Sequence, residues 1–153
     1  MRKIQRTRHR GMMFTSLYKR KTGKTLRRKI LALRQLGDIG AATALVRQAL
    51  NDTPDDIGLL KELANLRARA GDDEGIVAAL ESVRAIEPLG PHTAQLYDRA
   101  ALSVAKQQIE ALHRQGQDRE AIARIEAGLE RFPEDVCLLK SLAVSCAALD
   151  DPE

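Results

Sequence analysis

The stretch GDDEGIVAALESVRAIEP, residues 71–88, is the clearest copy of a pattern that occurs three times in the chain. It opens with a glycine, closes with a proline seventeen residues later, and places small and aliphatic residues at helical spacing between them. Gly37 to Pro54 and Gly116 to Pro133 have the same spacing, with an acidic or polar residue after each glycine. The first two copies start 34 residues apart, and the third starts 45 residues after the second. A period of this size predicts a solenoid of helix pairs.

Aliphatic residues recur at three- and four-residue intervals on both sides of each glycine, so each repeat is expected to form two antiparallel helices. In the first repeat this stripe consists of Leu26, Ile30, Leu33, Leu36, Ala42, Leu45, Val46, Ala49 and Leu50. Aromatic residues are only 3% of the chain and tryptophan is absent, which favours a core of Leu, Ile, Val and Ala between close-packed helices. The predicted fold is all-α, with the three helix pairs stacked on a continuous core.

Residues 91–101 are an insertion of eleven residues between the second and third repeats. Pro91 is typical of a first helical turn, and eleven residues make three turns, so the apolar face keeps its phase through Tyr97 and Leu102. The insertion therefore predicts a helix of about 22 residues whose first three turns project beyond the stack.

Residues 136–149 are expected to form a terminal helix with Val136, Leu139, Leu142, Ala143 and Cys146 directed inward. Cys137 and Cys146 are nine residues apart on this helix, too far for a bridge, and are interpreted as small core residues in a reducing compartment. The helix either caps the stack or is the first half of a fourth repeat in a longer protein, which the sequence from Leu149 to Glu153 favours.

Charge is divided sharply along the chain. Residues 1–37 hold 13 Lys and Arg and no acid, whereas the remainder holds 12 basic residues and all 21 acids. Residues 1–22, MRKIQRTRHRGMMFTSLYKRKT, are interpreted as a basic N-terminal arm. The arm is expected to bind nucleic acid, to lie on an anionic membrane surface, to act as a presequence, or to be a disordered tail that aids solubility or binds a partner.

The spacing resembles the tetratricopeptide repeat (TPR) family, with repeats at 23–56, 57–90 and 102–135 inside a solenoid domain at 23–153. The three glycines fall at position 15 of this 34-residue pattern and the three prolines at position 32. Position 20 holds Ala42, Ile76 and Ala121, and position 24 holds Val46, Leu80 and Ile125. The sequence departs from the family at position 4, where Leu26, Leu60 and Ala105 stand for the usual Trp, and at position 11, where Leu33, Arg67 and Leu112 stand for Tyr.

The resemblance implies that the first helix of each repeat lines a concave groove. The residues expected to face this groove and bind a partner are mostly basic: Lys24, Arg27, Arg34, Lys61, Asn65, Arg69, Lys106 and Arg114. Acids, Glu87 among them, are expected on the opposite face. The pattern indicates a groove for an acidic peptide or helix of another protein, and the alternative is that these charges are solvated helix faces.

No catalytic motif is found. His9, His92 and His113 are scattered, and the sequence contains no HExxH motif, no Cys/His cluster at metal spacing and no phosphate-binding loop. No stretch approaches the roughly 20 apolar residues of a membrane span. The expected function is a cytoplasmic, non-catalytic adaptor or scaffold for protein–protein interaction, with no cofactor and no small-molecule substrate. The alternative is a docking domain of a larger enzyme or complex whose basic arm binds nucleic acid or an anionic membrane.

Overall fold

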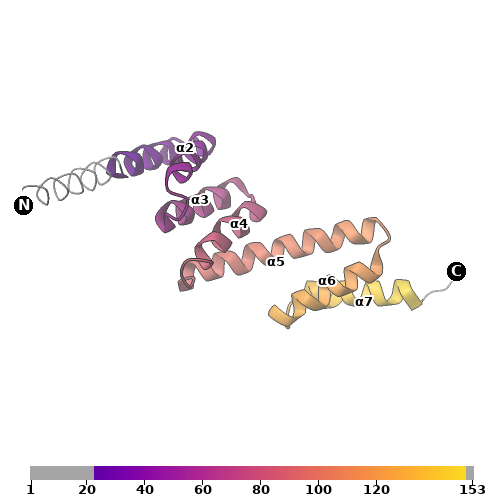
Figure 1. Cartoon of the computed structure of the whole chain (residues 1–153). Helices are drawn as coiled ribbons and strands as arrows, with labels where there is room; N and C mark the ends of the chain where they lie inside the picture. The colour runs from indigo at the N-terminus through magenta and orange to yellow at the C-terminus, as the bar shows by residue number, and fades with distance from the viewer. Residues whose placement is uncertain (1–22, 151–153) are drawn as a thin grey trace, which may run out of the picture. The chain divides into compact units, whose positions relative to one another are not determined.

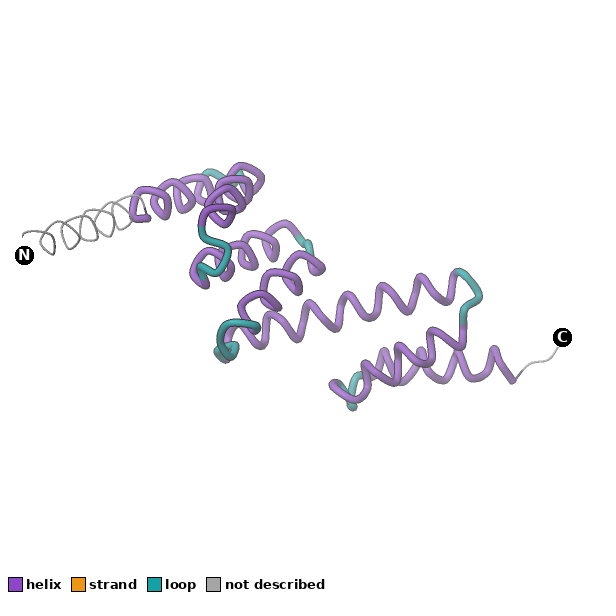
Figure 2. Tube along the Cα trace, in the orientation of Figure 1, coloured by secondary structure: helices purple, strands orange, loops and turns teal. Residues whose placement is uncertain are grey.

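The structure is a computed structural model and describes residues 23–150. All regular secondary structure in this range is helical, which confirms the all-α prediction for the described residues. Residues 23–35 form one helix. The other helices (Figures 1 and 2) are α2 (Ile39–Asp52), α3 (Ile57–Ala70), α4 (Asp73–Arg84), α5 (Pro91–Arg114), α6 (Asp118–Arg131) and α7 (Val136–Asp150). The predicted basic arm, residues 1–22, lies outside the described residues.

The chain divides into two compact units between Pro54 and Asp55. The described part of the first unit consists of the helix at residues 23–35 and α2, whose buried side chains are Ile30, Ala42 and Val46. The second unit contains α3 to α7, and here each helix packs against the next one in the sequence. This packing of successive helices is the arrangement expected of a helical solenoid or bundle.

The three repeat glycines end three helices in the same way. Gly37, Gly71 and Gly116 have φ values of 78°, 72° and 67°, the left-handed conformation that only glycine adopts at low cost. After each glycine, the next amide donates to the carbonyl oxygen five residues earlier, at 3.0 Å in all three cases. The glycine amide itself donates to the carbonyl three residues earlier. This pair of bonds is the Schellman motif, so the glycines stop the helices as the sequence predicts.

Aspartates begin four of the helices. The side chains of Asp38, Asp56, Asp72 and Asp135 each accept a hydrogen bond from the backbone amide three residues later, at 2.8–3.0 Å. These bonds satisfy amides that have no partner within their own helix. The four aspartates stand at recurring places in the repeat, either directly after a turn glycine or two residues after a closing proline. The repeat therefore specifies helix starts as well as helix ends.

Helix α5 has 24 residues, in agreement with the long helix that the insertion predicts. However, its first three turns do not project. Helix α4 packs against α5, Tyr97 and Ala100 are buried, and the Tyr97 hydroxyl donates a hydrogen bond to Glu81 of α4. The guanidinium of Arg131, at the end of α6, lies 4.6 Å from the centre of the Tyr97 ring. The extension is thus covered by α4, because its apolar stripe continues the face on which α4 packs (Figure 1).

A second cluster of buried side chains lies between the last three helices. Ile109 of α5, Ile125 of α6 and Leu138 of α7 form its centre. Helices α6 and α7 approach closely, because a Cβ added at Gly128 would lie 3.0 Å from Leu138 Cδ1. The inward face predicted for α7 is wrong for most of its residues: Val136 and Leu139 are 59% and 46% exposed and Ala143 and Cys146 are exposed, whereas Leu138 and Ser145 are fully buried. Of the predicted residues, Leu142 packs against the cluster. Most of α7 is apolar, so its sequence does not distinguish one face from another.

Candidate partner-binding surface

Helix α3 carries three of the predicted partner-binding residues on one side. Lys61, Asn65 and Arg69 follow each other at four-residue intervals, which places them in one row along the helix. Lys61 and Asn65 are half-buried, and Arg69 is exposed. Within the described part of the chain, Arg69 has no ion-pair partner, so its guanidinium is open to a ligand.

Lys61 is engaged within the chain. Its Nζ lies 2.7 Å from Oε1 of Glu87, in the segment that follows α4, and both side chains remain partly exposed. The expectation that Glu87 lies on an opposite, acidic face is therefore wrong. The pair neutralises part of the basic row on α3, so a carboxylate ligand must compete with Glu87 for Lys61.

Lys106 forms a similar pair at the start of α7. Its Nζ lies 2.9 Å from Oδ2 of Asp135, whose other carboxylate oxygen accepts the Leu138 amide hydrogen. The hydrogen bond from Lys106, followed by the backbone hydrogen bond, lowers the pKa of Asp135 below its ordinary value of 3.8. Lys106 thus connects α5 to the start of α7, so its main role is structural and not partner binding.

The other predicted residues lie on separate helices. Arg114 pairs with Glu110 one turn earlier on α5, and both side chains are exposed. In the first unit, Lys24 and Arg27 are exposed and Arg34 is half-buried on the helix at residues 23–35. The eight predicted residues therefore form three sets on three helices, and the row on α3 is the most closely spaced of them.

His113 also has an internal role. One of its ring nitrogens lies 2.6 Å from the hydroxyl oxygen of Ser145. Ser145 is fully buried on α7, so this bond satisfies a polar group at the contact between α5 and α7. The His113 side chain therefore takes part in the contact between α5 and α7.

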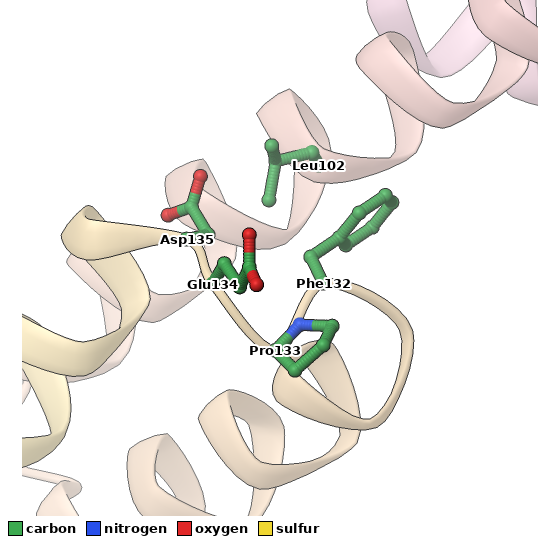
Figure 3. Close-up of a pocket in the computed structure, with 5 residues that line it drawn as sticks. All are labelled: Leu102, Phe132, Pro133, Glu134 and Asp135. Atoms are coloured by element: carbon green, nitrogen blue, oxygen red, sulfur yellow. The ribbon is translucent and has the colours of Figure 1, made fainter.

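An open hollow of about 330 Å³ lies beside the turn between α6 and α7 (Figure 3). Leu102 of α5 and the side chains of Phe132, Pro133, Glu134 and Asp135 line it. Apolar groups thus adjoin two carboxylates. This chemistry suits an apolar or positively charged side chain, so the hollow does not extend a surface for acidic ligands.

The described residues include no group of three or more His, Cys, Asp or Glu side chains that is placed to hold a metal ion. Cys137 and Cys146 are exposed, so their interpretation as core residues is wrong. In residues 23–150, no helix combines the length and the apolar composition that crossing a bilayer requires.

Neither the models of known protein families nor the sequences of curated proteins match this chain. The TPR resemblance therefore rests on the spacing of the repeats.

Proposed function

We propose that this chain is a non-catalytic, cytoplasmic adaptor with TPR-like repeats, which binds an acidic peptide or helix of a partner protein. The observation that carries the proposal is the row of Lys61, Asn65 and Arg69 on α3. An amide and a guanidinium at this spacing suit side-chain carboxylates that recur once per helical turn in a ligand. Arg114, on α5 of the same unit, would attract the same ligand over a longer range. The basic residues of the first helix, Lys24, Arg27 and Arg34, belong to the other unit and are a separate candidate set.

The internal ion pair at Lys61 does not prevent binding. Partly exposed ion pairs contribute about 0–1 kcal/mol, because solvent and salt screen them. A ligand carboxylate can therefore replace Glu87 at Lys61 with a small loss of free energy. Arg69 can donate hydrogen bonds to a second carboxylate of the ligand, because no acid among the described residues pairs with it. Lys106 is less available, because its partner Asp135 also caps α7.

The test uses an alanine-based helical peptide with glutamate at every fourth position, titrated into the full chain by isothermal calorimetry. The same peptide with glutamine in place of glutamate is the ligand control. The double variant Lys61→Glu, Arg69→Glu should weaken binding of the acidic peptide by about tenfold or more, because charged hydrogen bonds become repulsions. Asn65→Ala should weaken it less.

A matched variant separates contact from overall charge. Arg47→Glu, Arg119→Glu changes the net charge by the same amount at two exposed residues on α2 and α6. This variant should bind the acidic peptide almost as well as the native chain does. Equal losses in the two variants, or no loss in either, would show that the α3 row is not the binding site.

A second candidate function rests on the acid-free sequence of residues 1–37. In this alternative, the chain is a docking domain of a larger enzyme or complex, and its basic arm binds nucleic acid or an anionic membrane. Binding to a single-stranded oligonucleotide and to anionic vesicles should then fall steeply with salt and disappear when residues 1–22 are removed. Binding that is insensitive to salt contradicts both forms of this alternative.

A further inference from the structure

The helix at residues 23–35 exposes a basic face. Its apolar side chains lie on the inner side, where Ile30 is 3% exposed and Leu26 and Leu33 are half-buried. Three exposed cations lie within an arc of about 100° on the opposite side, and a fourth lies between the two sides. In this order, the four residues of the basic face are Lys24, Arg27, Arg28 and Lys29.

Neighbouring acids do not neutralise the basic face. Residues 1–37 contain no Asp or Glu, and none of the four cations has an ion-pair partner among the described residues. Like charges one turn apart on a helix repel each other, so a ligand with several negative charges would relieve this repulsion. In the second unit, by contrast, many cations pair with carboxylates of the chain: Lys61, Arg67, Arg84, Lys106, Arg114 and Arg131.

The spacing of the cations matches a ligand of high and uniform charge density. Four positive charges within six residues give roughly one charge per 2 Å of helix, because each residue advances the helix by about 1.5 Å. Double-stranded DNA carries about one negative charge per 1.7 Å of its axis. The guanidinium groups of Arg27 and Arg28 can each donate two parallel hydrogen bonds to a phosphate. Carboxylates that recur once per turn of an acidic peptide match this density less closely.

Two features of the first unit favour double-stranded DNA over other polyanions. A helix that lies on a membrane inserts its apolar face into the lipid, but here Ile30 is buried within the protein. Single-stranded nucleic acid stacks on aromatic side chains, and residues 23–54 contain no Phe, Tyr or Trp. A helix about 10–12 Å across fits the DNA major groove, which is about 12 Å wide, whereas the major groove of an RNA duplex is too narrow.

We propose that the basic face of the helix at residues 23–35 binds the phosphates of double-stranded DNA along the major groove. Leu31, which is 45% exposed, lies between Arg27 and Arg28 on the same side, and the groove offers thymine methyl groups as apolar contacts. Because phosphates carry most of the contact, binding should depend little on base sequence. The basic face includes no residue of the α3 row or of the arm at residues 1–22, so the proposal is independent of both functions proposed above.

The test measures binding of the full chain to a short DNA duplex of mixed sequence by fluorescence anisotropy at several salt concentrations. Each phosphate contact adds about 0.9 to the slope of log K against log salt concentration. The variant Lys24→Gln, Arg27→Gln, Arg28→Gln, Lys29→Gln should reduce the magnitude of this slope by about 3–4 and weaken binding at moderate salt at least about tenfold. Glutamine is a good helix former, so the circular dichroism of this variant should match that of the native chain.

A matched variant separates direct contact from net charge. It carries four substitutions at exposed cations that have no ion-pair partner among the described residues: Arg47→Gln, Arg99→Gln, Arg119→Gln and Lys140→Gln. Its affinity and salt slope should remain close to those of the native chain. Arg28→Gln alone should reduce the magnitude of the slope by about one, which provides a measurement with minimal change to the helix.

Three ligand controls identify the partner: an RNA duplex of the same sequence, anionic vesicles and the glutamate peptide used for the α3 row. The DNA duplex should bind the most tightly, and equal affinity for the RNA duplex would contradict docking in the major groove. Binding of vesicles or peptide without binding of DNA overturns the proposal, as do equal losses in the two fourfold variants. DNA binding with an unchanged salt slope in the basic-face variant also overturns it, and is the result that the basic-arm alternative predicts.

Discussion

Asp135 acts twice in the turn between α6 and α7. One carboxylate oxygen caps α7 through the Leu138 amide, and the other accepts a hydrogen bond from Lys106. Both interactions favour the ionised carboxylate, which is why its folded-state pKa lies below 3.8. A depressed folded-state pKa stabilises the protein above the unfolded-state pKa. This contribution is lost as the pH falls through the folded-state value.

Replacing Asp135 with asparagine should separate its two roles. Asparagine caps helices about as well as aspartate, but it has no charge for Lys106. At neutral pH, Asp135→Asn should therefore lower the free energy of unfolding by about 0.5–1 kcal/mol, and Asp135→Ala by about 1–2 kcal/mol. Urea titrations at several pH values measure this. The difference in free energy of unfolding between the native chain and Asp135→Asn should become smaller below pH 3.8. A difference that stays constant with pH would contradict the assigned ion pair.

Single residues explain what the sequence could predict and what it could not. The turn glycines were predictable, since a left-handed helix end strongly favours glycine. The acidic partners Glu87 and Asp135 were missed, because a long lysine side chain can reach several neighbouring segments. A usable signal existed, however, since each of these acids lies within two residues of a closing proline.

At the scale of elements, α5 departs most from a regular repeat. Its length follows from the insertion, because eleven residues add three turns in phase. Its contacts did not follow, because helical spacing identifies an apolar stripe but does not say which neighbour covers it. The same limit applies to α7, where apolar residues surround most of the helix. Tyr97 joins the elements here: it bonds to Glu81 of α4, and Arg131 at the end of α6 lies over its ring.

Removing the Tyr97 side chain should loosen both neighbours of α5. Tyr97→Ala leaves a cavity in place of a buried aromatic ring, which typically costs about 3–5 kcal/mol. Tyr97→Phe keeps the ring and loses only the hydroxyl bond to Glu81, so its cost should be about 1 kcal/mol. Hydrogen exchange measured along the chain should show faster exchange in α4 and at the end of α6 for Tyr97→Ala. Unchanged exchange in α4 would contradict the role of Tyr97 as the junction.

At the scale of the whole molecule, the repeat pattern predicts one stacked solenoid, whereas the chain divides into two compact units between Pro54 and Asp55. Repeat spacing describes what each helix pair needs to bury, and it carries little information on how firmly one pair is attached to the next. The binding surface is subject to the same limit. The α3 row was predictable from spacing, but its partial neutralisation depends on a contact between residues 26 positions apart.

The division predicts that residues 55–153 fold without the first unit. This fragment keeps every contact among α3 to α7, and compact units with their own buried core usually fold alone. Its circular dichroism should show helix, and its urea unfolding should be a single cooperative transition. Residues 72–153 provide the control: without α3, α4 loses one of the two helices that pack against it, so α4 should become less protected from hydrogen exchange. If residues 55–153 were unfolded, the first unit would be required for the second to form, and the boundary at Pro54 would not separate independent units.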